Sequence, residues 1–464
     1  MQHDFNFDNN SSSATVNENI LNDLKLKDTI IDSNNIDTKL INADKNMLKK
    51  TVIASIIGNT LEWFEYCLYG QFALIISQTF FPKNNSAIIL TWLIFAAGFI
   101  TRPMGGVILG AIGDKFGRKS ILSFSIIAMS LPTLGIGLLP SYEQIGIIAP
   151  ILLLIFRCIQ GFSMGGEFSS CITYMIENSP QNKRAFIGSF AFVSMCFGIL
   201  LGIFTSILMS YYLSEEEIFE FGWRIPFISG IFMGIVGLYI RKSLSESPIY
   251  QKMKQNSTLS KAPLNEALKF HKNKIVLGSI IYMSVTTNFY MFTIYIQSML
   301  QMELFQYTYS QIIQIISIGL ISLSVSLSLF SILADKIGRK KILIYGLISL
   351  SIISPIGFYL FDLNNIILTL FAESLICISL GAFMSSVPAV LVEIFPANVR
   401  FTCIGISYNL SAAIFGGTLP IIASYLLNIT NNTIYIQYYL WILNFMTLYW
   451  IYYKYTETKN ISIN

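Results

Sequence analysis

The sequence predicts an all-α integral membrane protein with twelve transmembrane helices in two six-helix halves. Hydrophobic residues make up 53% of the chain and charged residues only 12%, whereas a soluble domain carries about 25% charged residues. Apolar stretches of about 20 residues, the length that crosses a bilayer as a helix, follow one another along most of the 464 residues. Two loop motifs also occur twice in the same order. A soluble globule and a single-span receptor are therefore excluded.

The elements follow one another with short connections. Residues 1–46 are rich in Asn, Asp and Ser without sustained periodicity, which predicts a disordered cytoplasmic tail. The predicted spans are 51–76, 87–111, 119–139, 147–177, 185–210, 223–241, 275–300, 312–334, 342–361, 365–392, 401–427 and 434–453. These give an N-terminal six-helix bundle (47–241), a cytoplasmic linker loop (242–274), a C-terminal six-helix bundle (275–454) and a short cytoplasmic tail (455–464).

Positive charge alternates between loops. The basic loops hold Lys49, Lys50, Lys115, Arg118, Lys119, Lys183, Arg184, the six lysines of 252–274, Lys336, Arg339, Lys340, Lys341 and Lys454. The loops between them are acidic or neutral, with a cluster at Glu215, Glu216, Glu217 and Glu220. Cytoplasmic loops carry the excess of Lys and Arg. We therefore expect both termini and the linker on the cytoplasmic side.

An internal repeat is visible in the loops. DKFGRK begins at Asp114 and DKIGRK at Asp335, 221 residues later. The pattern E-x-x-P-x-x-x-R begins at Glu177 and again at Glu393, 216 residues later. Two independent patterns at nearly the same offset predict parallel six-span repeats, as in transporters that bind substrate between their halves.

Arginine is scarce, with eight residues against 22 lysines, which suggests that it is kept where its planar set of donors matters. Ionisable groups inside a membrane are costly and by default mark functional sites. Counted from the cytoplasmic ends at a rise of 1.5 Å per residue, Glu62, Arg102 and Glu167 lie about 15 to 18 Å deep. We expect them to form one polar layer near the midplane.

A second pair lies further out. Glu62 and Glu65 share one helix face, and Arg157, Gln160 and Glu167 share another. Burial and a neighbouring carboxylate favour a protonated carboxyl group, whereas a nearby arginine favours the charged one. Glu65 paired with Arg157 is therefore predicted to exchange a proton, although a permanent ion pair that only joins helices is the alternative.

The second half is expected to supply hydrogen bonds and aromatic faces to the same cavity. Its first span lacks charge and offers Tyr282, Asn288 and Tyr290. Ordinary packing is the alternative for each of these residues.

The repeated loops predict a conformational latch on the cytoplasmic side. Carboxylates and arginines there can pair with each other and with helix ends when the inner faces of the two halves meet. The predicted latch consists of Gly110, Asp114, Arg118, Glu177, Arg184, Asp335, Arg339, Glu393 and Arg400. Charges that only set the topology are the alternative.

Other chemistry is not indicated. The net charge of +4 is small and lies in short clusters, which excludes a nucleic-acid binder. The two histidines, His3 and His271, lie in polar segments, and the six cysteines stand singly in apolar spans without C-x-x-C spacing. We expect no catalytic residues, no metal, no cofactor and no obligate protein partner. No P-loop motif for an ATP-driven pump is present.

Several strings resemble the major facilitator superfamily, and within it the metabolite:proton symporter family. They are GNTLEWFEYCLYG (58–70), RPMGGVILGAIGDKFGRKSIL (102–122), RCIQGFSMGGEF (157–168), ENSPQNKR (177–184), GWRIPF (222–227), GLYIRKSLSESPIY (237–250) and EIFPANVR (393–400). The resemblance implies alternating access and uptake of a small polar metabolite with protons across a bacterial plasma (inner) membrane. It implies that Glu62, Glu65, Arg157 and Glu167 surround the central cavity.

The predicted function is a proton-coupled secondary transporter, not an enzyme, for a proline/betaine-type osmolyte, an amino acid or an organic acid. Trp63, Tyr66, Tyr282 and Tyr290 could form an aromatic cage for a quaternary ammonium group. Arg102 and Arg157 could instead bind a dicarboxylate. A membrane nutrient sensor without transport and an uncoupled facilitator of the same fold remain alternatives.

Overall fold

The computed structural model describes residues 47–82, 87–242, 244–302, 305–430 and 432–463. The chain divides into two compact units, 1–50 and 51–464. In the first unit the described residues 47–50 are helical, and the prediction for 1–46 lies outside the described residues. All that follows concerns the second unit.

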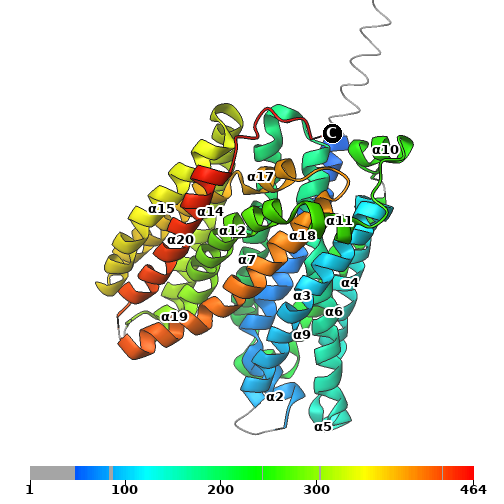
Figure 1. Cartoon of the computed structure of the whole chain (residues 1–464). Coiled ribbons are helices and arrows are strands. Elements are labelled where there is room, and N and C mark those ends of the chain that lie inside the picture. Colours follow the sequence, from blue (N-terminus) through cyan, green and yellow to red (C-terminus); the bar gives the residue numbers. More distant parts are fainter. Residues whose placement is uncertain (1–46, 83–86, 243, 303–304, 431, 464) are drawn as a thin grey trace, which may run out of the picture. The chain divides into compact units, whose positions relative to one another are not determined.

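The second unit is helical throughout its regular structure in the described residues (Figure 1). Its first half consists of a helix over 51–71, α2 (Ala73–Phe80), α3 (Ala87–Phe116), α4 (Arg118–Leu138), α5 (Tyr142–Ile145), α6 (Ile148–Glu177), α7 (Arg184–Tyr212), α8 (Glu215–Glu217) and α9 (Arg224–Lys242). A 3-10 turn, η1 (Gln181–Lys183), precedes α7, and a π-helical turn, η2 (Ile218–Gly222), precedes α9.

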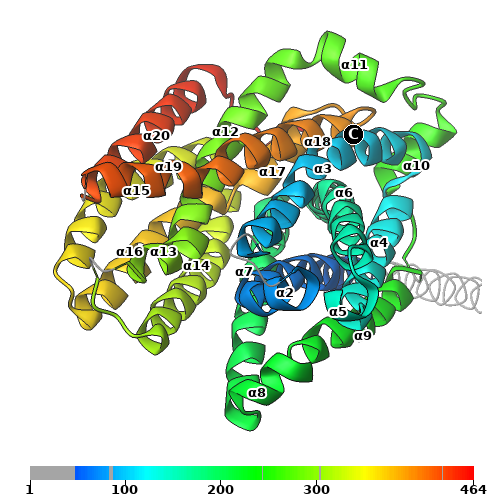
Figure 2. The same cartoon turned by 90° about the horizontal axis from the view of Figure 1, so that it is seen from below.

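The second half repeats this order. It consists of α12 (Lys272–Tyr290), η3 (Met291–Tyr295), α13 (Ile296–Leu300), α14 (Tyr309–Ile337), α15 (Arg339–Asp362), α16 (Ile366–Met384), α17 (Val387–Ile394), α18 (Arg400–Ser411), η4 (Ala412–Gly416), α19 (Gly417–Thr430) and α20 (Ile434–Lys454). Figure 2 shows the same structure from below, where the helices from α2 to α9 form one group and the helices from α12 to α20 form another.

Ten helical segments among the described residues are long and apolar enough to cross a membrane. The helix over 51–71, continued by α2, and the tyrosine-rich α20 of 21 residues occupy the other two predicted spans but are not among these ten. Large apolar side chains such as Ile100, Phe232 and Leu329 are exposed on the sides of the helices. In a soluble protein contiguous apolar surface of this kind is rare, and contact with lipid explains it.

Glycine makes the sharp turns inside the repeated loops. Gly117 between α3 and α4 and Gly338 between α14 and α15 have φ of 110° and 109°. Residues with a side chain rarely adopt this conformation. The glycine of each D-K-x-G-R-K motif therefore reverses the chain between two membrane-spanning helices.

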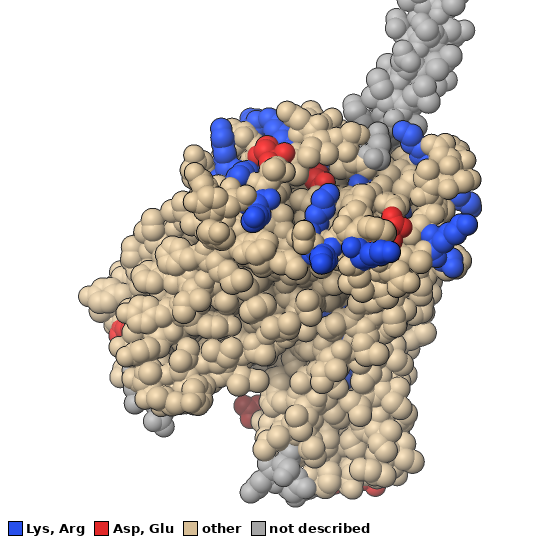
Figure 3. Space-filling view, in the orientation of Figure 1, with Lys and Arg blue, Asp and Glu red and all other residues tan. Residues whose placement is uncertain are grey.

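The linker contains more structure than the predicted loop. Two short helices lie in it, α10 (Pro248–Gln255) and α11 (Pro263–Phe270). Each begins with proline, which fits the first helical turn because its missing N–H would be unpaired there. The Ser247 hydroxyl accepts from Tyr250 N and caps α10. Lys and Arg gather at this end of the unit on the face drawn in Figure 3, which we call the basic end.

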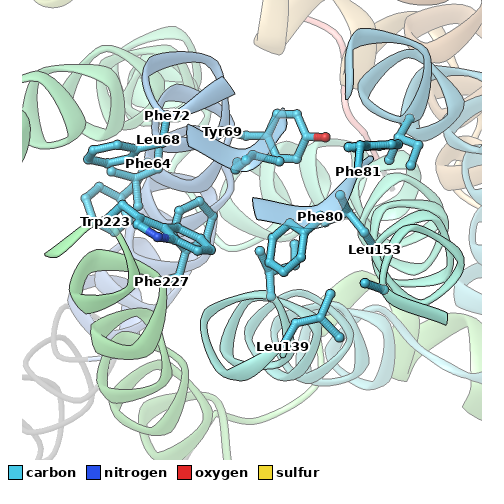
Figure 4. Close-up of a cluster of buried hydrophobic side chains, with 14 of the residues drawn as sticks. Phe64, Leu68, Tyr69, Phe72, Phe80, Phe81, Leu139, Leu153, Trp223 and Phe227 are labelled. Carbon is cyan, nitrogen blue, oxygen red and sulfur yellow. The ribbon is translucent and has the colours of Figure 1, made fainter. Parts of the chain in front are cut away.

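The first half has an aromatic core towards the opposite end (Figure 4). Trp223 lies between Phe80 and Phe227, with ring centroids 5.7 and 5.8 Å away. Phe64, Leu68 and their neighbours in the 51–71 helix complete the cluster. This packing fixes the helix that carries Glu62 and Glu65.

Candidate functional site

Arg102 of α3 joins the two halves at the centre of the unit. Its Nη2 donates to Glu62 Oε1 at 3.2 Å, the ion pair expected from their depth. Arg102 also donates to Tyr408 Oη and, through Nε, to Asn409 Oδ1 at 3.3 Å, both on α18 of the second half. All of these side chains are buried. A charged group shared across the interface is therefore held by both halves.

Glu167, the third residue of the predicted polar layer, does not join the Glu62–Arg102 ion pair. Glu167 pairs with Arg241, the penultimate residue of α9, and accepts from Ser125 Oγ. Arg241 also donates to the Leu122 carbonyl. Sequence reasoning missed Arg241 because it counted Arg241 as the end of a span. A long arginine side chain can reach back into the bundle from a helix end.

Arg157 and Glu65 are linked through a third residue. Arg157 Nη1 donates to Gln160 Oε1 at 2.9 Å, and Gln160 Nε2 donates to Glu65 Oε2 at 3.1 Å. Gln160 also donates to Thr133 Oγ1 at 2.7 Å. The expected direct ion pair is not formed, because the amide occupies the space between the two charges. Arg157 instead lies over the Tyr69 ring, 4.3 Å from its centroid.

Two carboxylate oxygens at this site, on Glu62 and Glu65, have no partner among the described residues. Glu62 Oε2 and Glu65 Oε1 are buried without a hydrogen bond to any described residue. Burying an unpaired anionic oxygen costs several kcal/mol. Protonation removes that cost, so both groups suit proton binding.

Aromatic side chains from both halves meet beside these charges. The ring centroid of Trp63 lies 5.4 Å from that of Tyr66 and 6.4 Å from that of Tyr290, and the centroids of Tyr66 and Tyr290 are 6.5 Å apart. One small cavity is lined by Trp63, Met195, Tyr282, Val285, Thr286, Phe289, Tyr290, Met384, Tyr408 and Ala412. A second is lined by Tyr66, Phe95, Gly98, Phe99, Arg102, Arg157, Gly161 and Met164. Each holds about one water molecule, so the halves must separate to admit a larger ligand.

Tyr282 and Tyr290 line the first cavity as expected, but Asn288 does not. The Asn288 amide donates to Asn444 Oδ1 of α20 at 2.8 Å and to the Ser284 carbonyl at 2.7 Å. Its position on α12 turns it towards α20, away from the first half. Asn288 thus lines neither of these two cavities, and its role in the transport cavity stays a prediction.

The charged residues of the predicted latch lie in two clusters of ion pairs, one of Asp114, Arg118, Glu177 and Arg400 and one of Asp335, Arg339, Glu393 and Arg184. Asp114 accepts from Phe401 N at 3.2 Å and Thr402 N at 2.8 Å, at the start of α18. Asp335 accepts from Ala185 N at 3.0 Å and Phe186 N at 2.9 Å, at the start of α7. Backbone N–H groups at a helix N-terminus favour a negative charge. Each half thus places an aspartate on a helix start of the other.

Ion pairs between arginine and glutamate lie beside these aspartates. Glu177 lies 3.3 Å from Arg118 and 2.7 Å from Arg400. Glu393 lies 3.1 Å from Arg339 and 3.7 Å from Arg184. Gly110 lies against α18, where a Cβ at this position would come within 2.9 Å of Thr402 Cα. The two halves are therefore in direct contact at the basic end.

Two further carboxylates, Glu246 and Glu457, contact residues of the predicted latch, and sequence reasoning missed both. Glu246 accepts from Arg118 N at 3.1 Å, and Ser247 Oγ donates to Glu177 at 2.5 Å. In the second half Glu457 accepts from Arg339 N at 3.0 Å, and Thr458 Oγ1 donates to Glu393 at 2.6 Å. The sequence did contain a signal for these two carboxylates, because Glu246 lies in the string S-E-S and Glu457 lies in the similar string T-E-T, 211 residues later.

The comparisons with known proteins agree with this geometry. A family model described as "Sugar (and other) transporter" matches residues 50–274. A "Putative proline/betaine transporter" of Staphylococcus aureus (strain COL) is 35% identical over 418 residues, covering 88% of each chain. A "Glycine betaine/proline/ectoine/pipecolic acid transporter" of Dickeya dadantii is 33% identical, covering 86% of this chain and 82% of the relative.

Solved structures share the fold. The proton:xylose symporter XylE, a major facilitator superfamily protein, superposes with a TM-score of 0.71 at 18% identity, covering 90% of this chain and 98% of that one. The predicted all-α membrane fold is thereby confirmed. The chain is a transporter and not an enzyme, and it belongs to the major facilitator superfamily, in the metabolite:proton symporter family that includes the proline/betaine transporters.

Proposed function

We propose that this protein imports a zwitterionic osmolyte of the proline/betaine type together with protons by alternating access. The observation that carries the proposal is the position of Arg102, which is bound by Glu62 in the first half and by Tyr408 and Asn409 in the second. A substrate carboxylate that binds Arg102 competes with Glu62. Glu62 then loses its cation and takes up a proton, which links substrate binding to protonation.

The aromatic cluster favours a zwitterion over a dicarboxylate. Tyr66 lines the cavity that Arg102 lines, and Trp63 and Tyr290 of the other cavity have ring centroids 5.4 and 6.5 Å from that of Tyr66. Aromatic rings attract quaternary or secondary ammonium groups. Arg157, the second arginine that a dicarboxylate would need, is occupied by Gln160 and the Tyr69 ring. The names of the relatives, proline/betaine transporters, support the same class of substrate.

The latch supports alternating access. With the aspartates on the helix starts and the arginine–glutamate pairs formed, the basic end is closed. Opening that end requires Asp114 and Asp335 to leave the opposite half. We place the basic end and both termini at the cytoplasm of a bacterial plasma membrane, because cytoplasmic loops carry the excess of Lys and Arg. The closed state is then the one that accepts substrate from outside.

The test is uptake into proteoliposomes that contain the purified protein. We expect labelled proline or glycine betaine to accumulate when the outside is acidic relative to the lumen, and a dye in the lumen to report proton entry with substrate. Succinate serves as the dicarboxylate control. Uptake that ignores the pH gradient would identify an uncoupled facilitator, and binding without uptake would identify a sensor; either result rejects the proposal.

A further inference from the structure

A carboxylate of the second half lies apart from the cavity described above. Glu373 of α16 is buried, and Cys377 Sγ donates to its Oε1 at 3.2 Å. Its Oε2 has no hydrogen-bond partner, and no ion pair joins Glu373 to another described residue. Gly319 of α14 faces it, where a Cβ would come within 2.8 Å of Oε1. The neighbouring helix therefore leaves room for this side chain.

The repeat gives Glu373 a counterpart in the first half. At the offset of the E-x-x-P-x-x-x-R motif, Glu373 corresponds to Arg157. At the offset of the D-K-x-G-R-K motif, Gly319 corresponds to Gly98, and a Cβ at Gly98 would come within 3.3 Å of the Arg157 carbonyl. The two helix pairs thus meet at corresponding residues.

A second set of contacts supports the same correspondence. A Cβ at Gly165 would meet the Arg102 carbonyl, and a Cβ at its counterpart Gly381 would meet the carbonyl of Leu323, the counterpart of Arg102. Three polar residues of the candidate site on α3 and α6 have apolar counterparts in the second half. Arg102 corresponds to Leu323, Gln160 to Ile376 and Glu167 to Phe383. The second half has therefore kept one ionisable group where the first half has several.

Polar side chains lie between Glu373 and the end of the unit opposite to the basic end. Glu373 is seven residues into α16, about 10 Å along the helix. Thr369 lies one turn nearer to that end on the same helix face, and its hydroxyl is 2.7 Å from Tyr307 Oη. Tyr307 is partly exposed, so water reaches that side chain.

The other ionisable groups on the packed helices lie elsewhere. On α14 and α15, Asp335, Lys336 and Arg339 are at the basic end, and Asp362 is at the opposite helix end, where it accepts from Thr433. Tyr282 and Tyr290 of α12 line the first cavity, and Tyr295 of η3 accepts from Ser424. Cys377 on α16 donates to Glu373, and Cys377 in turn interacts with Cys196 of α7. No cation among the described residues stabilises a charged Glu373.

From this placement we propose that Glu373 is a second proton-binding site, separate from Glu62 and Glu65, which takes its proton from the outer side by way of Tyr307 and Thr369. The inference rests on the proposed proton-coupled function. The buried carboxyl group is neutral in the closed state, because a buried carboxylate without a cation is costly. When the halves rearrange and water enters, Glu373 releases the proton and becomes the carboxylate.

The experiment compares Glu373→Gln, which mimics the protonated form, with Glu373→Asp and with the exposed-loop control Glu216→Gln. In proteoliposomes the wild type gives the number of protons that enter per substrate molecule. We expect that ratio to fall in Glu373→Gln, to be restored in part in Glu373→Asp and to be unchanged in Glu216→Gln, while exchange of labelled for unlabelled substrate continues. An unchanged ratio in Glu373→Gln overturns the inference.

A second measurement does not depend on transport. Infrared spectra of the wild type at neutral pH should contain a protonated-carboxyl C=O band that is absent in Glu373→Gln, and absence of such a difference also overturns the inference. If the wild type takes up substrate without protons but shows the band, the proposed function fails while Glu373 remains a proton-binding group. The two failures are thereby distinguished.

Discussion

Gln160 separates Arg157 from Glu65. Its carbonyl oxygen accepts from the arginine at 2.9 Å and its amide donates to the carboxylate at 3.1 Å. Reorientation of one side chain can therefore change what both charges contact. We infer that Gln160 couples the position of Arg157 to the protonation of Glu65.

The first prediction tests this link. Gln160→Leu removes hydrogen bonds to two ionisable groups, each worth about 1.5–3 kcal/mol. We expect gradient-driven accumulation to fall about tenfold or more. Gln160→Glu, which can still bond to Arg157 but repels Glu65, should shift the pH dependence instead. Accumulation at the wild-type level in Gln160→Leu would contradict a coupling role.

The second prediction concerns Glu65, whose Oε1 is buried without a partner among the described residues. Glu65→Gln cannot exchange a proton but keeps the hydrogen-bonding shape of the side chain. It should abolish accumulation driven by a pH gradient and spare exchange of labelled for unlabelled substrate. Glu220→Gln in the exposed turn is the matched control. Unchanged accumulation in Glu65→Gln would remove Glu65 from the mechanism.

The third prediction concerns Glu177, which faces Arg118 and Arg400 at the basic end. Glu177→Gln leaves two buried guanidinium groups without this counter-charge, and breaking a buried pair costs about 3–5 kcal/mol. We expect the closed state to be depopulated. Cys403 on α18 is buried beside the latch, so its alkylation by a maleimide reports the opening. Cys403→Ser gives the background alkylation of the other cysteines. If Cys403 is as well protected in Glu177→Gln as in the wild type, Glu177 does not hold the closed state.

The fourth prediction uses the close approach at Gly110. Gly110→Ala places a Cβ within 2.9 Å of Thr402 Cα, so the two helices must move apart. Faster alkylation of Cys403 and lower thermal stability should follow. Gly417→Ala is the matched control, because no atom lies within 4 Å of a Cβ there. If both variants behave alike, the contact does not hold the halves together.

The fifth prediction is a pH dependence outside the membrane-spanning segments. Burial opposes ionisation of Glu457, but backbone N–H donors from Lys340, Arg339, Lys459 and Thr458 outweigh it and hold the pKa of Glu457 below its ordinary value of 4.5. The folded pKa is depressed, so the stabilisation is fully present above pH 4.5 and is lost as pH falls through the folded value.

The measurement is thermal unfolding of the wild type and of Glu457→Gln in detergent. The wild type should be more stable near neutral pH, and the difference should shrink below pH 4.5. A difference that does not change with pH would show that Glu457 acts by shape and not by charge.

The sequence by itself determined the fold class and the family, and it singled out charged residues that form ion pairs at the basic end. Apolar spans of bilayer length require helices, since every backbone polar group must be paired inside lipid. The D-K-x-G-R-K motif could be interpreted from sequence because the turn at its glycine depends on the local backbone conformation. Depth counting also placed Glu62 beside Arg102, since a helix rises by a constant step.

Only the tertiary structure decided which partners these charges have. Glu167 pairs with Arg241, which lies 74 residues away, Gln160 separates Arg157 from Glu65, and Asn288 turns to α20. The rotation of each helix about its axis and the reach of long side chains determine such pairings, and helical spacing specifies neither. Arg102 likewise reaches Tyr408 and Asn409, more than 300 residues away, because the two halves meet there. Residues on one helix share a face by periodicity, but contacts between the halves exist only once the helices pack.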